Sequence, residues 1–122
     1  MKNLLTLLFI LPFIVFSQKS VIGKPYNLNG LEIAQFDFTQ PMNYEEATEA
    51  CSKLGDGWRL PTKEELNILY QNKDKIGGFA NKYYWSSTED GSGNVWWQDF
   101  GDGYQNVYYK GANDYVRAVR AF

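Results

Sequence analysis

The stretch Gly57-Trp58-Arg59-Leu60-Pro61-Thr62-Lys63-Glu64-Glu65-Leu66 decides the fold, because it carries the chain from an extended segment into a helix. Pro61 disfavours the helical backbone region for the residue before it, so residues 58–60 are expected to be extended. Thr62 and Glu65 are spaced as a capping box, in which each side chain accepts a hydrogen bond from the other residue's backbone N–H. Apolar residues then follow at helical spacing, which predicts a helix from Lys63 to Gln71 or Lys73.

The residues before this stretch predict one strand and one helix. Residues 31–38 alternate in polarity, and we interpret them as a first strand that ends before Pro41. Asn43 and Glu46 have capping-box spacing and begin the first helix. One stripe of this helix carries small and apolar side chains, namely Ala47, Ala50, Cys51 and Leu54. Gly55 is expected to end the helix in the left-handed conformation.

The residues after this stretch are rich in aromatic side chains separated by Gly/Asp turns. Their propensity predicts strands over residues 83–88, 95–100, 105–110 and 115–122. Four strands at such short spacing favour a single antiparallel meander. Because two helices precede the strands, the predicted fold class is α+β.

The first seventeen residues are expected to be a secretory signal peptide rather than part of the fold. Lys2 precedes an apolar run over residues 4–16, and Gln18 follows a suitable cleavage position. The run is short for a membrane span, so an uncleaved anchor is the less favoured alternative. We therefore expect an exported protein, in the periplasm, at the cell surface or secreted, with no membrane span after cleavage. Residues 18–30 are interpreted as a lead-in segment and residues 31–122 as the domain.

The composition excludes several classes of function. The 122 residues carry 12 basic and 14 acidic side chains, so nucleic acid is not an expected partner. Histidine is absent, which removes the commonest general base and the commonest metal ligand. Cys51 is the single cysteine, so no disulfide can form within the chain, and its place on the apolar stripe predicts a buried thiol.

The order of these short motifs resembles that of the Legionella collagen-like protein C-terminal domain family. The residues that carry the resemblance are Ala47 and Cys51, residues 57–62, Glu65-Leu66, residues 84–87, the strand from Trp96 to Phe100, and residues 116–120. The family is widespread as an exported domain of unknown function. The resemblance implies a C-type-lectin-like fold with two helices packed on short twisted antiparallel strands, and with the N- and C-terminal strands close together. It also implies that Trp85, Trp96 and Phe100 lie in the core.

The resemblance further implies binding rather than catalysis. The founding member is an adhesin whose C-terminal domain is implicated in binding host glycans. The family is also similar to formylglycine-generating enzymes, which use a pair of cysteines, whereas this chain has one cysteine on a different element. That activity is therefore not expected here. The acidic balance of the chain also argues against a sulfated, anionic glycan as the preferred ligand.

Aromatic side chains interleaved with small polar ones make residues 83–115 the candidate binding region. Rigid rings give contact area at low entropic cost, and neighbouring polar groups give adaptable hydrogen bonds. The alternative is that these rings only fill a β-rich core. The predicted ligand-binding residues are Trp97, Asp99, Asp102, Tyr104, Asn106, Tyr108 and Asn113.

The acidic turn residues and the arginines do not indicate hydrolysis, calcium binding or an anion site. A hydrolase would need paired carboxylates, for which the candidates are Glu89, Asp90, Asp99 and Asp102, but acidic residues are common in turns for their own hydrogen bonds. Asp90, Ser92 and Asn94 are spaced like part of a Ca²⁺ loop, although a hydrated hairpin turn is the preferred interpretation. No cofactor is therefore predicted. For the arginines Arg59, Arg117 and Arg120 we expect structural ion pairs, for example between an arginine and Glu65.

The sequence thus predicts an exported, non-enzymatic binding domain for a glycan or protein ligand. The alternative is a structural or assembly module of the cell envelope with no small ligand. The identity of the ligand and the oligomeric state are left open at this stage.

Overall fold

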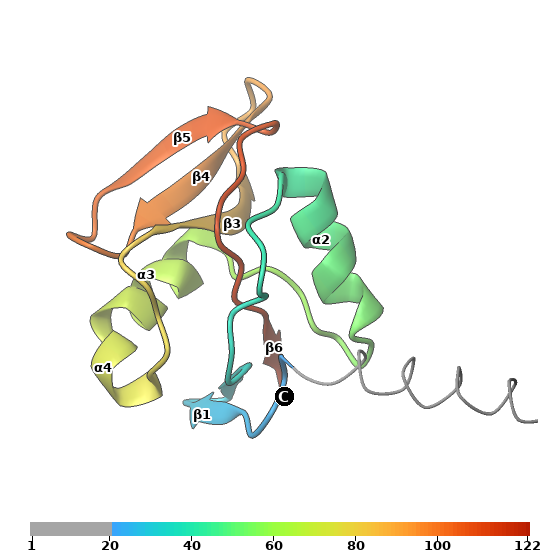
Figure 1. The fold of residues 1–122 in the computed structure, drawn as a ribbon, viewed down its shortest axis with the longest axis vertical. Coiled ribbons are helices and arrows are strands. Elements are labelled where there is room, and N and C mark those ends of the chain that lie inside the picture. The colour runs from blue at the N-terminus through green and yellow to red at the C-terminus, as the bar shows by residue number, and fades with distance from the viewer. Residues whose placement is uncertain (1–20) are drawn as a thin grey trace, which may run out of the picture.

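A computed structural model describes residues 21–122, so the expected signal peptide at residues 1–17 lies outside the described residues. Two three-stranded antiparallel sheets and three helices form this part of the chain (Figure 1). The helices are α2 (Tyr44–Lys53), α3 (Lys63–Gln71) and α4 (Lys73–Ile76). The small sheet has the order β1-β2-β6, with β1 (Tyr26–Leu28), β2 (Leu31–Ile33) and β6 (Val119–Ala121). The large sheet has the order β3-β4-β5, with β3 (Tyr83–Glu89), β4 (Asn94–Asp99) and β5 (Gln105–Tyr109).

The two longer helices begin where the sequence predicts. Both N-termini have complete capping boxes, Asn43 with Glu46 in α2 and Thr62 with Glu65 in α3. Gly55 has φ of 77°, as expected for a residue that ends a helix in the left-handed conformation. The four-residue α4 is not predicted, because one helical turn leaves almost no periodic pattern in the sequence.

The prediction of one four-stranded meander is wrong. The last strand, β6, does not follow β5 in the large sheet but pairs with β2 in the small one, which brings the first and last strands of the domain together. Both strands are also shorter than predicted. The first ends at Ile33 instead of residue 38, and the last begins at Val119 instead of residue 115. The segment interpreted as a lead-in contributes β1, which joins β2 through the turn at Asn29 and Gly30.

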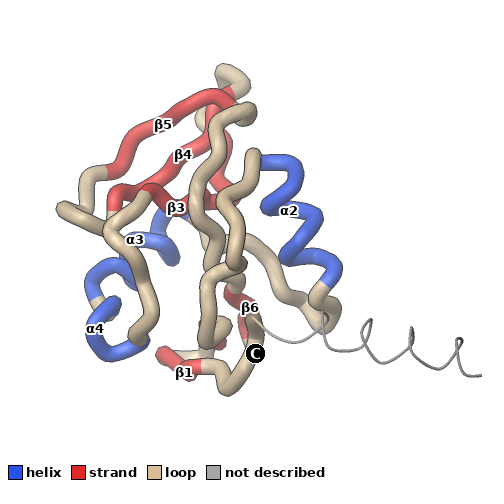
Figure 2. The backbone as a smooth tube through the Cα atoms, in the orientation of Figure 1, coloured by secondary structure: helices blue, strands red, loops and turns tan. Residues whose placement is uncertain are grey.

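The first and last strands are shorter than predicted because the chain next to each of them forms an irregular segment that changes hydrogen-bond partners along its length. Residues 34–42 and 112–118 run side by side between the two sheets, drawn as loops in Figure 2. Backbone bonds of 3.0 Å join Ala34 N to Ala118 O and Phe38 N to Val116 O. Further along, Tyr115 bonds to β3 instead, with its N–H on Tyr83 O at 2.8 Å. Bends at residues 35–36 and 39–40 interrupt the first of these segments, so the predicted strand does not continue there and the bonds do not make a regular ladder.

The core consists of two clusters of buried side chains. One lies under α2 and includes Ala47, Cys51, Trp58, Trp85 and Val95. The other lies under α3 and includes Ile33, Leu66, Leu69, Tyr84 and Phe100. The prediction of a buried thiol at Cys51 is confirmed, and burial raises the pKa of this thiol to about 12.

The resemblance also implied that three large rings lie inside, and two of them do. Trp85 and Phe100 are fully buried. Trp96 is only half-buried, because the Lys63 ammonium covers its ring at 3.5 Å from the centroid instead of a hydrophobic side chain.

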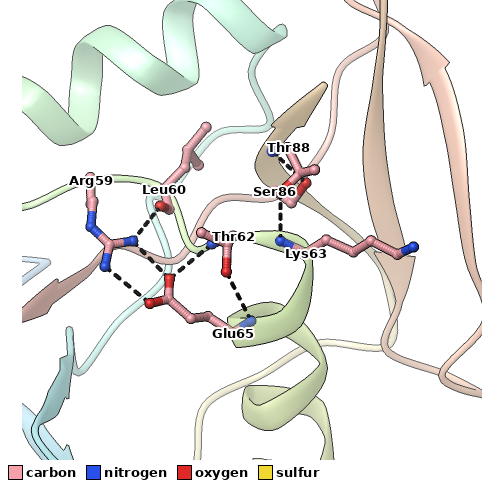
Figure 3. Close-up of polar contacts among 7 residues, drawn as sticks. All are labelled: Arg59, Leu60, Thr62, Lys63, Glu65, Ser86 and Thr88. Carbon is pink, nitrogen blue, oxygen red and sulfur yellow. Dashed lines mark hydrogen bonds and ion pairs between the residues drawn. The ribbon is translucent and has the colours of Figure 1, made fainter. Parts of the chain in front are cut away.

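An arginine fork ties α3 to the last strand, as the sequence predicts. Arg59 Nη1 and Nη2 donate to the two oxygens of the Glu65 carboxylate at 2.7 and 3.0 Å (Figure 3). The same carboxylate accepts from Thr62 N at 2.9 Å, which closes the capping box. The hydrogen bond from Arg59 is the main reason that the pKa of Glu65 is lowered. Because the backbone of Arg59 pairs with Val119, the helix start and β6 are held together.

A second arginine, Arg117, lies in the centre of the molecule with no exposed side-chain surface. Its Nε donates to Asp37 Oδ1 at 2.7 Å, and its Nη1 donates to the carbonyl oxygens of Ala34 and Gly77 at 3.2 and 3.3 Å. The other Asp37 oxygen accepts from Tyr84 Oη at 2.6 Å. Three distant segments therefore meet on one ion pair. The third arginine, Arg120, pairs with Glu32 on the neighbouring strand.

Replacing Glu65 with alanine is expected to lower the free energy of unfolding by about 1–3 kcal/mol, because the capping box and the arginine fork are lost together. Urea unfolding followed by circular dichroism measures the effect. Glu64→Ala is the matched control, since Glu64 is an exposed glutamate in the same helical turn. Equal losses in the two variants would contradict the assigned role of Glu65.

Arg117→Met is expected to cost about 3–5 kcal/mol, because it leaves the mostly buried Asp37 carboxylate without its cation. Arg120→Met makes the same chemical change at a more exposed ion pair and should cost about 1 kcal/mol or less. Thermal and urea unfolding of both variants test this order. A smaller loss for Arg117→Met than for Arg120→Met would show that the buried pair is not the centre of the fold.

Candidate functional site

One face of the large sheet is covered by α3. Gln98, which is fully buried, donates from Nε2 to Asn67 Oδ1 on α3 at 2.9 Å. On the same face, the amide N–H of Lys63 bonds to Thr88 Oγ1 at 2.9 Å, so the helix start is fixed to β3 (Figure 3). This face is therefore part of the interior.

The opposite face is covered only in part. Tyr44 from α2 packs edge-on against Trp85 with the ring centroids 5.9 Å apart, and Val95 is buried beside them. Beyond this area no helix within residues 21–122 is packed on the face, and aromatic side chains of the described chain are exposed there. We call this surface the ring face and define it by Tyr83, Trp97, Asp99, Tyr104, Asn106 and Tyr108.

The rings of this face hold one another in place. Tyr83 stacks on Trp97 with the centroids 4.4 Å apart and the planes 17° from parallel. Tyr104 meets the same indole edge-on at 6.2 Å. Asn106, which lies opposite Trp97 in the sheet register, donates from Nδ2 to Tyr104 Oη at 3.4 Å. Tyr83, Tyr104 and Tyr108 are exposed by 47%, 59% and 52%, so the rings form a surface and not a sealed core.

The predicted ligand-binding residues divide into two groups. Five of them belong to the ring face, namely Trp97, Asp99, Tyr104, Asn106 and Tyr108. Asp102 and Asn113 are exposed residues in turns at opposite ends of β5, a five-residue strand that spans roughly 17 Å. These two side chains therefore lie far from each other, and neither belongs to the strands that form the ring face.

The turn carboxylates proposed for a hydrolase or a cation are engaged locally. Asp90 Oδ1 accepts from Ser92 Oγ at 2.7 Å and from the Ser92 and Asn94 amides at 2.8 and 3.3 Å, and the bond from the serine side chain is the main reason that its pKa is lowered. Asp99 and Asp102 accept from backbone amides two residues further along, Gly101 and Tyr104. Glu89 pairs with Lys110 at 2.9 Å. Within residues 21–122 no cluster of three or more His, Cys, Asp or Glu side chains is arranged to hold a metal ion.

Two residues near the ring-face rings, Tyr83 and Asp114, are not among the predicted ligand-binding residues. Tyr83 is two residues from Trp85 along β3, so the two side chains point to the same face. Strand alternation therefore predicts Tyr83 on the ring face. Asp114 gave no such signal, because it reads as the end of a turn. In the structure it is only 7% exposed, and its Oδ2 has no hydrogen-bond partner among the described residues. Burial raises the pKa of its carboxyl to about 6.

The outer edge of the ring face is the strand β5, which pairs with β4 on one side only. Unpaired backbone groups at such an edge can recruit further strands. Here the Asn106 side chain turns back, and its Oδ1 accepts the Val107 N–H at 2.8 Å. One outward-facing donor is therefore satisfied within the chain.

Two open cavities are lined by residues that do not belong to the ring face. One of about 440 Å³ lies along α2 and is lined by Tyr44, Glu45, Thr48, Glu49 and Ser52. A second, of about 250 Å³, lies beside α4 and is lined by residues such as Lys73, Gly78 and Asn81. The ring face therefore differs from an enclosed small-molecule pocket, and it presents rings on the surface of a sheet. None of the helices within residues 21–122 has the length and apolar character needed to cross a membrane.

Comparisons with known proteins agree with this architecture. The profile of the Lcl C-terminal domain family matches residues 19–120. A search of curated proteins finds no significant match. Among solved structures, botrocetin superposes with a TM-score of 0.63 at 11% identity, over 82% of this chain and 98% of that chain. The snake venom toxin convulxin gives 0.61 at 10% identity, over 82% and 96% of the two chains.

A third similar structure is EMS16, described as an antagonist of the collagen receptor integrin α2β1. It gives a TM-score of 0.57 at 12% identity, over 80% of this chain and 97% of that chain. At such low identity these likenesses establish the fold alone. They show that the fold is C-type-lectin-like, as the resemblance implied.

The buried carboxyl of Asp114 is expected to make stability depend on pH. Its pKa is 3.8 in an unfolded chain and about 6 in the folded one, so over this interval the folded state keeps a proton that the unfolded state has lost. The free energy of unfolding should therefore fall by about 2–3 kcal/mol as the pH rises from 3.8 to 6, and then level off.

Asp114→Asn should remove the part of this pH dependence that comes from Asp114 and leave the part that comes from other carboxyls unchanged. Urea unfolding at a series of pH values from 3.5 to 8 measures the difference between the two proteins. A difference that stays constant across the series would contradict the raised pKa.

Proposed function

The chain belongs to the Lcl C-terminal domain family, and we propose that it is an exported, non-enzymatic binding domain whose carbohydrate or protein ligand docks on the ring face. The single observation that carries this proposal is the exposure of stacked aromatic rings beside small polar side chains. Soluble proteins keep most large rings inside, so a cluster at the surface marks an interaction site. Export is supported by the apolar segment that precedes residue 18.

A protein ligand is supported by what is known of proteins with the same fold. Botrocetin forms a complex with the A1 domain of von Willebrand factor, and EMS16 is an antagonist of a collagen receptor. An aromatic surface with adaptable amides suits a partner that is itself a folded protein. Tyrosine and tryptophan are enriched in such interfaces, where they dominate the binding energy.

A carbohydrate ligand is supported by the geometry of the rings. Tyr83 and Trp97 present an aromatic stack, and one side of it is at the surface. The apolar face of a sugar ring can pack on such a surface while its hydroxyl groups bond to neighbouring amides and carboxylates. Asn106 and Asp99 lie in register with Trp97 and Tyr83, so polar groups flank the stack.

The non-enzymatic part of the proposal is supported by the state of the carboxylates. Asp90, Asp99 and Asp102 each hold backbone amides of their own turns, and Glu89 is paired with a lysine. Glycoside cleavage requires one carboxylic acid and one free carboxylate across a shared cleft. Side chains that are already committed to turn geometry suit a structural role better than such a pair.

The alternative function, an assembly module of the envelope with no small ligand, would suit a domain whose rings are all buried. Three ring-face tyrosines are about half exposed, and Tyr109 at the edge strand is exposed by 54%. This exposure favours the binding domain over the purely structural module.

The combined change Trp97→Ala, Tyr104→Ala and Tyr108→Ala is expected to weaken ligand binding at least about tenfold, because it removes the aromatic surface. Binding is measured on a glycan array and by pull-down from envelope extract. The double change Phe36→Ala and Phe122→Ala is the matched control, since it removes exposed rings that lie outside the three strands of the large sheet. Circular dichroism establishes that each variant is folded. Unchanged binding in a folded ring-face variant would place the site elsewhere.

A further inference from the structure

Two buried polar atoms on the same side of the large sheet lack hydrogen-bond partners. They are Asp114 Oδ2 and Trp97 Nε1, and no other such side-chain atoms are found in the described part of the chain. A buried polar group that stays unpaired costs free energy, so each such group in a native structure needs an explanation. Here one atom is an acceptor and the other is a donor.

The sheet register puts both residues beside Tyr83. Tyr84 and Tyr115 form a parallel bridge and their rings pack together, so Tyr83 and Asp114 both point to the opposite side, toward the ring face. Trp97 lies one strand further and stacks on Tyr83 at 4.4 Å. Asp114 is also opposite Met42, which packs on the same core cluster as Trp97. The unpaired acceptor and the unpaired donor therefore flank one half-exposed tyrosine ring.

The chemistry of the two atoms narrows the class of ligand. An ammonium or guanidinium group could donate to Asp114 but could not accept from the indole N–H. A sulfate or carboxylate could accept from the indole but would be repelled by the buried carboxylate. A hydroxyl group can do both, because it donates one hydrogen bond and accepts others. Asp99, which lies opposite Tyr83 on this face, adds further negative charge, which also disfavours an anionic ligand.

Binding at these atoms requires Tyr83, which stacks on Trp97 and lies beside Asp114 in the sheet register, to change rotamer. Tyr83 is 47% exposed, and exposed side chains change rotamer on the picosecond to nanosecond timescale. A turn of the Tyr83 side chain would break its stack on Trp97 and free that face of the indole. The aromatic surface for stacking would remain, since Trp97 and Tyr104 still meet edge-on.

We propose that Asp114 and Trp97 form the polar half of the ring-face site and that its ligand is a neutral carbohydrate. The sugar stacks on the rings, and its hydroxyl groups donate to Asp114 Oδ2 and accept from Trp97 Nε1–H. This inference rests on the proposed function, because it names the ligand class of the same face. It also gives the two unpaired atoms a role, since they cost stability in the free protein and gain partners when the ligand binds.

The test is calorimetric titration with a panel of neutral tetrasaccharides built from glucose, N-acetylglucosamine, galactose or mannose, with heparin as the anionic comparison. We expect at least one neutral member to bind and heparin to bind more weakly. Asp114→Asn keeps the shape of the side chain but removes the negative charge of the acceptor. Trp97→Phe keeps an aromatic ring but removes the N–H donor. Each should weaken binding of that saccharide roughly tenfold or more.

The distinguishing readout is thermal stability. At pH 7 the melting temperature of Asp114→Asn should equal or exceed that of the unchanged protein, because an uncompensated buried charge is removed. A merely structural Asp114 would lose stability on substitution. Matched controls are Trp96→Phe, on the covered face of the same strand, and Asp74→Asn, an aspartate outside the large sheet. Both should leave saccharide affinity unchanged.

Three results would overturn the inference. They are heparin binding more tightly than every neutral saccharide, unchanged affinity in both Asp114→Asn and Trp97→Phe, and no binding of any panel member. In the last case, a protein captured from envelope extract and lost in the ring-face variant would leave the proposed function standing and reject only the carbohydrate. If the ring-face variant still bound every protein or saccharide that the unchanged chain binds, both the proposed function and the carbohydrate ligand would be rejected.

Discussion

The buried ion pair between Arg117 and Asp37 is the constraint on which the rest of the structure depends. A guanidinium with no solvent contact is tolerable only when most of its donors are bonded, and here a carboxylate and two carbonyl oxygens take them. Those partners come from the segment after β2 and from the loop after α4, while the arginine belongs to the chain just before β6. The requirement to satisfy one charge therefore fixes three remote parts of the chain relative to one another.

The ring face is a consequence of this arrangement. The two extended segments around Arg117 run between the sheets, and the later one continues the large sheet past β3 through Tyr115. It thereby carries Asp114 next to Tyr83. On the other face, α3 is held by the Arg59 fork and covers the sheet completely enough to bury Gln98. One side of the sheet is thus committed to the interior, and part of the other is left for contact with a ligand.

The parts of the fold that could be predicted are those specified by neighbours in sequence. The capping boxes at Asn43 and Thr62, the stop at Gly55 and the strands between Gly/Asp turns all follow from local chemistry, and the structure has them. The partner of the last strand could not be predicted, because alternation within residues 115–122 gives the face of each side chain but not the neighbouring strand. For the candidate site, the exposed tyrosines followed from alternation. Asp114 did not, since its burial arises from Met42 and β3, both remote in sequence.

The side-chain bond at the edge of β5 bears on how copies of this domain behave at high concentration. A short aromatic strand without proline at the rim of a sheet is the kind of segment that nucleates cross-β stacking. Asn106 Oδ1 accepts the hydrogen bond of the Val107 N–H, so an incoming chain cannot pair with that amide unless this bond breaks. An uncharged amide thus blocks part of the sheet edge, a role that lysine often has in other proteins. It does so without placing a positive charge beside the neighbouring rings. Colloidal solubility and an aromatic surface can then coexist on one strand.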